Sequence, residues 1–125
     1  MEFKLKLGEV LNINQSLKEI IDGSDKVEAL FKFRLLGIMK TFEPFVNNFE
    51  TVRNEKILEL GEPTEDGNFR IPPEDKEVIE IYNSEITAVI NSEVTLNIEK
   101  LKVEDVFNKG VDSIHLMSLY PILEE

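Results

Sequence analysis

The stretch FKFRLLGIMKTFEPFVNNF, residues 31–49, holds five of the chain's eight phenylalanines. Its apolar residues recur at steps of three and four, which is the spacing of one face of a helix. This phenylalanine seam consists of Phe31, Leu35, Ile38, Phe42, Phe45, Phe49 and Val52. The spacing predicts one long helix from about Val27 to about Leu60, and we expect Gly61 to end it.

Pro44 lies in the middle of this predicted helix. Proline has no amide hydrogen, and its ring crowds the carbonyl of Lys40, where the missing hydrogen bond would have been made. The seam spacing nevertheless continues on both sides of the proline. We therefore predict a kink and not an end, with two helical arms, residues 27–43 and 45–60, that meet at more than ~20°.

The length of the helix also makes a bend or an outside contact necessary. At 1.5 Å per residue the helix would measure ~50 Å, whereas a compact domain of this size is only ~36 Å across. A straight helix would therefore project beyond its own domain. Either Pro44 bends the helix, or its projecting end packs on another subunit.

Further elements follow from the spacing of apolar residues on either side of the long helix. Apolar and polar residues alternate over residues 3–7 and 94–98, which predicts two strands. Helical spacing predicts an N-terminal helix from about Glu9 to Ile21. Residues 62–75 are rich in proline and acids and predict a loop, after which helical spacing returns. A last short helix is expected from Ile114 to about Tyr120, capped by Asp112 or Ser113.

Together these elements predict an α+β fold that is mostly helical, as a single domain over residues 1–125. The long, Pro-kinked helix and the second helix form an antiparallel hairpin, joined by the N-terminal helix. The N-terminal segment and residues 94–98 form a small two-stranded sheet. Because an isolated two-stranded ribbon is marginal in water, this sheet must pack on the helices. The residues expected to face the helices are Phe3, Leu5, Leu96 and Ile98.

The residue types that carry most enzyme chemistry are scarce. The chain has no cysteine, which excludes disulfides, thiolate metal sites and a cysteine nucleophile. Its single histidine, His115, has no second imidazole or evident serine partner, so we expect a packing or surface role. The acidic turn at residues 62–67 resembles a calcium loop, but Pro73 stands where that loop needs a bidentate glutamate. We predict no catalytic residue, no cofactor and no metal, and a protein that is not an enzyme.

Charge is strongly acidic and unevenly distributed. The net charge is −11, and residues 59–80 alone carry eight acids and two bases. Such a surface repels phosphate backbones, so direct nucleic-acid binding is not expected. The acidic region is either a solvated face that aids solubility or a mimic of nucleic acid that occupies a basic groove on another protein. For the second interpretation the candidate contact residues are Glu74, Asp75, Glu77 and Glu80.

The phenylalanine seam also has two interpretations. It is either core, buried against the other helices of the same chain, or in part an exposed surface that contacts a client or a second copy of the chain. The candidate contact residues are Phe31, Phe42, Phe45 and Phe49. Four more apolar residues of the same helix lie beside the seam and widen the apolar face: Phe33, Leu36, Met39 and Val46.

No targeting signal is recognised in the sequence. The first ten residues, MEFKLKLGEV, are charged and alternating, unlike a signal peptide. No apolar stretch approaches the ~20 residues of a membrane span. We expect a soluble, cytoplasmic protein that makes no membrane contact.

Five segments carry a resemblance to a known group of proteins. They are KLKLGEVLNINQSLKEI (4–20), FETVRNEKILELGE (49–62), EDGNFRIPPED (65–75), NSEVTLNIEKLKVEDV (91–106) and LMSLYPILEE (116–125). In order and pattern they resemble a family of short, poorly characterised proteins encoded by tailed bacteriophages and prophages. The resemblance implies a phage or prophage origin and a non-enzymatic role in the host cell cytoplasm. It contains no catalytic motif and transfers no functional residue.

The leading hypothesis is a small phage-encoded accessory protein that acts by protein–protein interaction, as a chaperone of virion assembly such as a tail chaperone. Its partners would be a phage structural or host protein and further copies of itself. The alternative is an acidic inhibitor of a host defence or nucleic-acid-processing protein. An enzyme such as a hydrolase or transferase would require a pocket that converges on His115.

Overall fold

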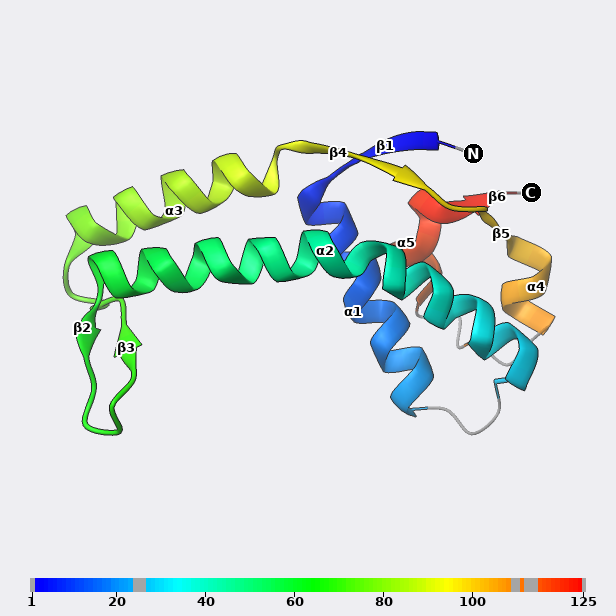
Figure 1. The fold of residues 1–125 in the computed structure, drawn as a ribbon, viewed down its shortest axis with the longest axis horizontal. Coiled ribbons are helices and arrows are strands. Elements are labelled where there is room, and N and C mark those ends of the chain that lie inside the picture. Colours follow the sequence, from blue (N-terminus) through cyan, green and yellow to red (C-terminus); the bar gives the residue numbers. More distant parts are fainter. Residues whose placement is uncertain (1, 24–26, 109–110, 112–114, 125) are drawn as a thin grey trace.

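The fold consists of a packed head and a projecting arm (Figure 1). It is taken from a computed structural model, which describes residues 2–23, 27–108, 111 and 115–124. The head contains β1 (Glu2–Lys6), α1 (Leu7–Gly23), the first half of α2 (Ala29–Leu60), β4 (Glu93–Asn97) and the C-terminal elements. The arm contains the second half of α2, a short β-hairpin and α3 (Lys76–Ile90). This is the mostly helical α+β fold that the sequence predicts.

The predicted pair of strands is confirmed. β1 and β4 are antiparallel, with Phe3 opposite Leu96 and Leu5 opposite Val94. Leu5 and Leu96 are buried and Phe3 is half-buried, so this face of the ribbon packs on the helices. The first strand ends one residue earlier than predicted, because Leu7 already begins α1.

α2 is one continuous helix with Pro44 in its interior, and its ribbon changes direction near the middle (Figure 1). The helix therefore continues through the proline, as predicted. That the proline causes the change of direction stays a prediction. The bend coincides with a change of packing partner. Before it, α2 packs on α1, and the seam residues Phe31 to Phe42 are at most 7% exposed. After it, α2 packs on α3, and Phe45, Phe49 and Val52 are only half-buried.

α3 returns antiparallel along the second half of α2, as predicted for the helical hairpin (Figure 1). Its Ile86 is buried, and most of its other apolar residues are half-buried. Two helices alone cannot enclose a core, so the arm is packed much more thinly than the head.

The connection between the two helices is more ordered than the predicted loop. It contains a hairpin of two-residue strands, β2 (Glu62–Pro63) and β3 (Phe69–Arg70). Gly61 begins it: a side chain there would lie 2.4 Å from the Ile57 carbonyl oxygen and 2.6 Å from that of Arg70. Gly67 forms the turn with φ +85°, a conformation that glycine adopts without strain. Two-residue strands are too short to leave an alternating pattern in the sequence.

The C-terminal region contains elements that the sequence analysis missed. A helix, α4 (Val103–Asn108), follows β5 (Leu101–Lys102), which pairs in parallel with β6 (Leu123–Glu124). The last α-helix is α5 (Leu116–Leu119), continued by a 3-10 turn, Tyr120–Ile122. The predicted caps, Asp112 and Ser113, lie outside the described residues. Leu101, Leu119 and Ile122 are fully buried, so this region completes the core of the head.

Candidate functional site

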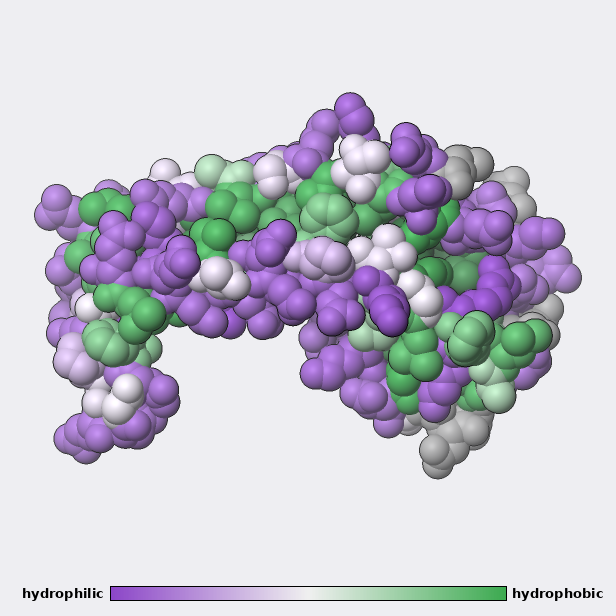
Figure 2. Space-filling view, viewed as in Figure 1, coloured by the Kyte–Doolittle hydropathy of each residue, from purple (hydrophilic) through white to green (hydrophobic). Residues whose placement is uncertain are grey.

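An apolar patch lies on the solvent side of the first half of α2. Its three residues are Leu30, Phe33 and Leu36, with 68%, 73% and 48% of their surface exposed. We call this set the α2 patch. Figure 2 shows the hydrophobic surface over the first turns of α2. The three residues follow one another at steps of three, so they form an oblique ridge on the helix face opposite the buried seam.

The patch continues into a shallow pocket between α1 and α2. The pocket measures about 450 Å³ and is lined by Leu36, Met39 and Val46 of α2 and by Asn14 of α1, together with Lys40, Glu43 and Asn47. Apolar residues exposed next to one another in this way mark protein contacts more often than isolated ones do. The region can therefore accept an apolar side chain of a partner.

Of the four seam phenylalanines expected to contact a partner, two are buried in the core. Phe31 and Phe42 are 2% and 0% exposed, so they are core residues and are not available to a partner. Phe45 and Phe49 are half-buried, and Phe45 packs against the core of the head. The exposed phenylalanine of α2 is Phe33. The expectation that Phe33 and Leu36 widen the seam is wrong, because both lie on the opposite face of α2, which no element of the described chain covers.

The acidic candidates lie together at the far end of the arm. Glu74, Asp75, Glu77 and Glu80 are all exposed. Asp75 also has a structural task, because its carboxylate accepts a hydrogen bond from the Val78 amide at 3.2 Å and caps α3. Residues 45–90, which form the arm, contain eleven acids and four bases, so they carry −7 of the net −11. Most of the net charge thus lies on the arm, whereas the α2 patch lies on the head.

The acidic turn of the hairpin is held by its own hydrogen bonds. Asp66 accepts from the Thr64 hydroxyl and, at 3.3 Å, from the Asn68 amide. The Thr64 hydroxyl, followed by the two Asn68 donors, lowers the pKa of Asp66 below its ordinary value. Across the described ranges, no group of three or more histidine or acidic side chains is placed to hold a metal.

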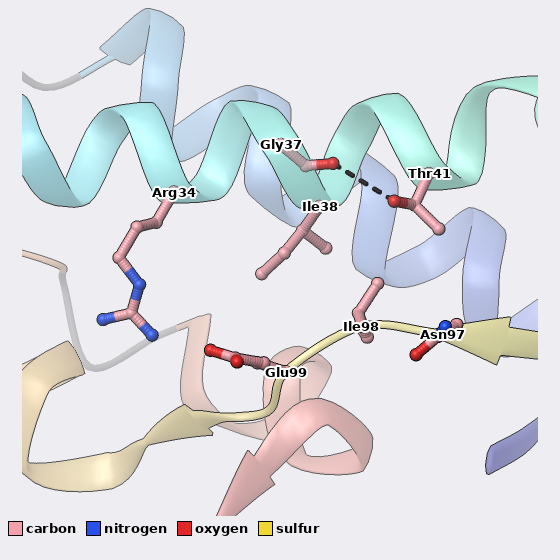
Figure 3. Close-up of a pocket in the computed structure, with 7 residues that line it drawn as sticks. All are labelled: Arg34, Gly37, Ile38, Thr41, Asn97, Ile98 and Glu99. Atoms are coloured by element: carbon pink, nitrogen blue, oxygen red, sulfur yellow. Dashed lines mark hydrogen bonds between the residues drawn. The ribbon is translucent and has the colours of Figure 1, made fainter. Parts of the chain in front are cut away.

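A second pocket, of about 250 Å³, lies between α2 and the segment that follows β4. Figure 3 shows Arg34 and Ile38 pointing from α2 toward Glu99 and Ile98. The Thr41 hydroxyl in its wall donates to the Gly37 carbonyl at 3.3 Å. Arg34 also lies 3.7 Å from Asp105. The residues that line this pocket include no nucleophile paired with a base, so its geometry does not assemble a catalytic group.

His115 lies at the start of α5, against α1. Its Nδ1 is 4.0 Å from a carboxylate oxygen of Glu19, and its side chain is 13% exposed. It lines neither the pocket beside the α2 patch nor the pocket beside Arg34. Its position is that of a residue packed between two helices.

Two surfaces therefore remain as candidates for function: the α2 patch on the head and the acidic end of the arm. The first can exclude water from an apolar partner, and the second can attract a basic one. In the part of the chain that the structure describes, no helix is both long and apolar enough to cross a membrane. Comparisons with protein-family models, curated proteins and solved structures found no significant match to this chain.

Proposed function

We propose that this chain is a small, non-enzymatic accessory protein of phage or prophage origin that acts in the host cytoplasm by binding other proteins. Its role is that of an assembly chaperone, which covers an apolar segment of a virion protein, such as a tail protein, until that segment is built in. The resemblance of the sequence to short phage proteins supports the phage origin.

The observation that carries this proposal is the α2 patch. Phe33 is 73% exposed and lies between two exposed leucines, so the apolar surface of three neighbouring side chains stays in contact with water. This contact is unfavourable. A partner that covers the patch removes this apolar surface from water, which favours binding. The firmly packed seam beneath it holds the patch in place, so binding would require little reordering.

The acidic arm suits the same role. A chaperone that holds an apolar segment must itself stay soluble, and a net charge of −11 opposes aggregation. Because most of this charge is on the arm, it does not surround the apolar patch. The complex of protein and client would therefore keep a charged, solvated surface.

Capture from infected or lysogenic cells tests the proposal. Wild-type protein should retain a phage structural protein, and Phe33→Glu should lose it. Met117→Glu is a matched control, since Met117 is 86% exposed on α5, outside the patch. Retention should change little with salt, because the contact is apolar. Failure to capture any phage structural protein, or equal capture by Phe33→Glu, would contradict the proposal.

A second candidate function uses the other surface. The exposed acids at the end of the arm support an inhibitor that occupies the basic groove of a host defence or nucleic-acid-processing protein. Replacing Glu74, Glu77 and Glu80 by lysine should then abolish binding, and binding should weaken steeply with salt. Asp75 is left unchanged in this variant because it caps α3. Salt-independent binding that survives the three changes would exclude this function.

A further inference from the structure

We propose that, when no client is bound, the α2 patch is covered by the α2 patch of a second copy of this chain, in an antiparallel, two-fold contact centred on Phe33. This inference rests on the proposed function, because it names what occupies the same surface in the free protein. Self-association would then keep the patch from unspecific contacts, and a client would compete with the second copy.

The arrangement of residues around Phe33 is symmetric along the helix. Leu30 lies three residues before it and Leu36 three residues after it, while Ala29 and Gly37 lie four residues away on either side. In an antiparallel contact, a two-fold axis at Phe33 places Leu30 of one copy opposite Leu36 of the other. The small residues then face one another. The patch is therefore complementary to itself, as a two-fold interface requires.

Gly37 gives a second reason to place another helix here. It lies inside α2, where glycine is less favourable than alanine. A β-carbon built on Gly37 has no atom within 4 Å, so the packing of this chain does not require glycine at that position. Because Gly37 has no side chain, a second helix could approach α2 closely at this point, since the distance between helix axes depends on the residues at the contact.

Charge restricts where a second copy can approach. The whole chain carries −11, but residues 28–43 contain three bases and two acids, a net charge of +1. Two copies therefore repel one another only weakly through this part of α2. The antiparallel arrangement also directs the two acidic arms, into which α2 continues, toward opposite ends of the dimer (Figure 1). A second copy can therefore cover the patch without strong charge repulsion at the contact and without bringing the two acidic arms together.

The size of the patch indicates a weak, reversible contact. From the exposed fractions of its three residues, the patch offers roughly 350 Å² of apolar side chain per copy. Two such surfaces with their polar margins remain near or below the ~1,200 Å² of the smallest stable interfaces. We therefore expect a dimer that dissociates on dilution, which a client can displace.

Sedimentation of the purified protein over a range of concentrations tests the inference. The wild-type chain should pass from monomer to dimer, and Phe33→Glu should raise the dissociation constant at least ~10-fold. The Met117→Glu control should associate as the wild type does. At concentrations where the wild type is monomeric, circular dichroism should show unchanged melting of Phe33→Glu, since the side chain is exposed in one copy. A wild-type protein that stays monomeric, or a dimer that Phe33→Glu leaves intact, would overturn the inference.

Crosslinking supplies an independent measurement, because the chain has no cysteine. At the proposed contact Ala29 of one copy faces Gly37 of the other, so oxidation of the double variant Ala29→Cys/Gly37→Cys, which keeps Phe33, should give a covalent dimer, while Met117→Cys should give little. Equal crosslinking of the two variants would contradict the contact. The result is separable from the function: a monomeric protein that captures a phage protein through Phe33 refutes only the dimer. A dimer that captures none refutes only the chaperone.

Discussion

Lys56 of α2 and Glu85 of α3 form an ion pair that joins the two helices of the arm, with 2.8 Å between Nζ and Oε2. The same ammonium group lies 2.9 Å from Oε2 of Glu59, one turn further along α2. The hydrogen bond to Glu85, followed by that to Glu59, raises the pKa of Lys56 above its ordinary value of 10.5. The arm, which has a thin apolar interface, is thus also held by a charged contact.

The raised pKa of Lys56 predicts how the stability of the arm depends on pH. A group with a higher pKa in the folded chain contributes its full stabilisation below its unfolded pKa, and loses it as the pH rises through the folded pKa. The difference in melting temperature between the wild type and Lys56→Met should therefore be constant at neutral pH and shrink above pH 10.5. The difference should be small, because the pair is solvent-exposed. A difference that grows in alkali would contradict this assignment.

The two halves of the phenylalanine seam should differ in their effect on stability. Phe42 is fully buried in the head, whereas Phe49 is half-buried in the arm. We expect Phe42→Ala to lower the free energy of unfolding by about 3–5 kcal/mol, and Phe49→Ala to lower it by roughly half as much. Urea denaturation of both variants measures this. Equal losses would mean that the arm encloses its phenylalanines as well as the head does.

Removal of the first strand should expose β4. Deletion of residues 2–6 takes away Leu5 and Phe3, and leaves the apolar β4 without its hydrogen-bonded neighbour. We expect loss of cooperative melting or aggregation, measured by circular dichroism and light scattering. Lys4→Glu is the control, because Lys4 is exposed on the same strand. A truncated protein that melts like the wild type would show that the ribbon contributes little.

Local patterns predicted the elements that are long and regular. The alternation around Leu5 and Leu96 and the seam along α2 both indicate burial of one face. The structure buries Leu5, Leu96 and the first half of the seam. The fully buried Leu101, by contrast, is part of a two-residue strand whose partner lies more than twenty residues away. Such pairing depends on tertiary contacts, so neither the spacing of apolar residues nor the turn residues predict it.

The candidate site was less predictable, for a related reason. The seam spacing marks Phe31 and Phe33 as apolar residues of the same helix, but it does not say how many neighbours will cover that helix. α1 covers the side with Phe31, and no element of the described chain covers the side with Phe33. The acidic end of the arm could be predicted, since its acids are close together in the sequence and cannot all be buried.

The bend at Pro44 leads to the last prediction. Proline in a helix interior is less favourable than alanine by ~3 kcal/mol. Pro44 lies between the part of α2 that packs on α1 and the part that packs on α3. Pro44→Ala should restore the hydrogen bond to the Lys40 carbonyl and straighten the helix. The half-buried Phe45 and Phe49 would then turn away from their neighbours, so self-association should increase.

Distances across the bend measure this directly. Spin labels on Ala29→Cys and Glu59→Cys lie before and after Pro44, and no native cysteine interferes. A straight helix separates these positions by ~45 Å, and the bent wild type should give a shorter distance that lengthens in Pro44→Ala. Both proteins should carry Phe33→Glu, so that contacts between copies do not contribute. The same distance in both would mean that packing of α2 on α1 and α3, and not the proline, sets the bend.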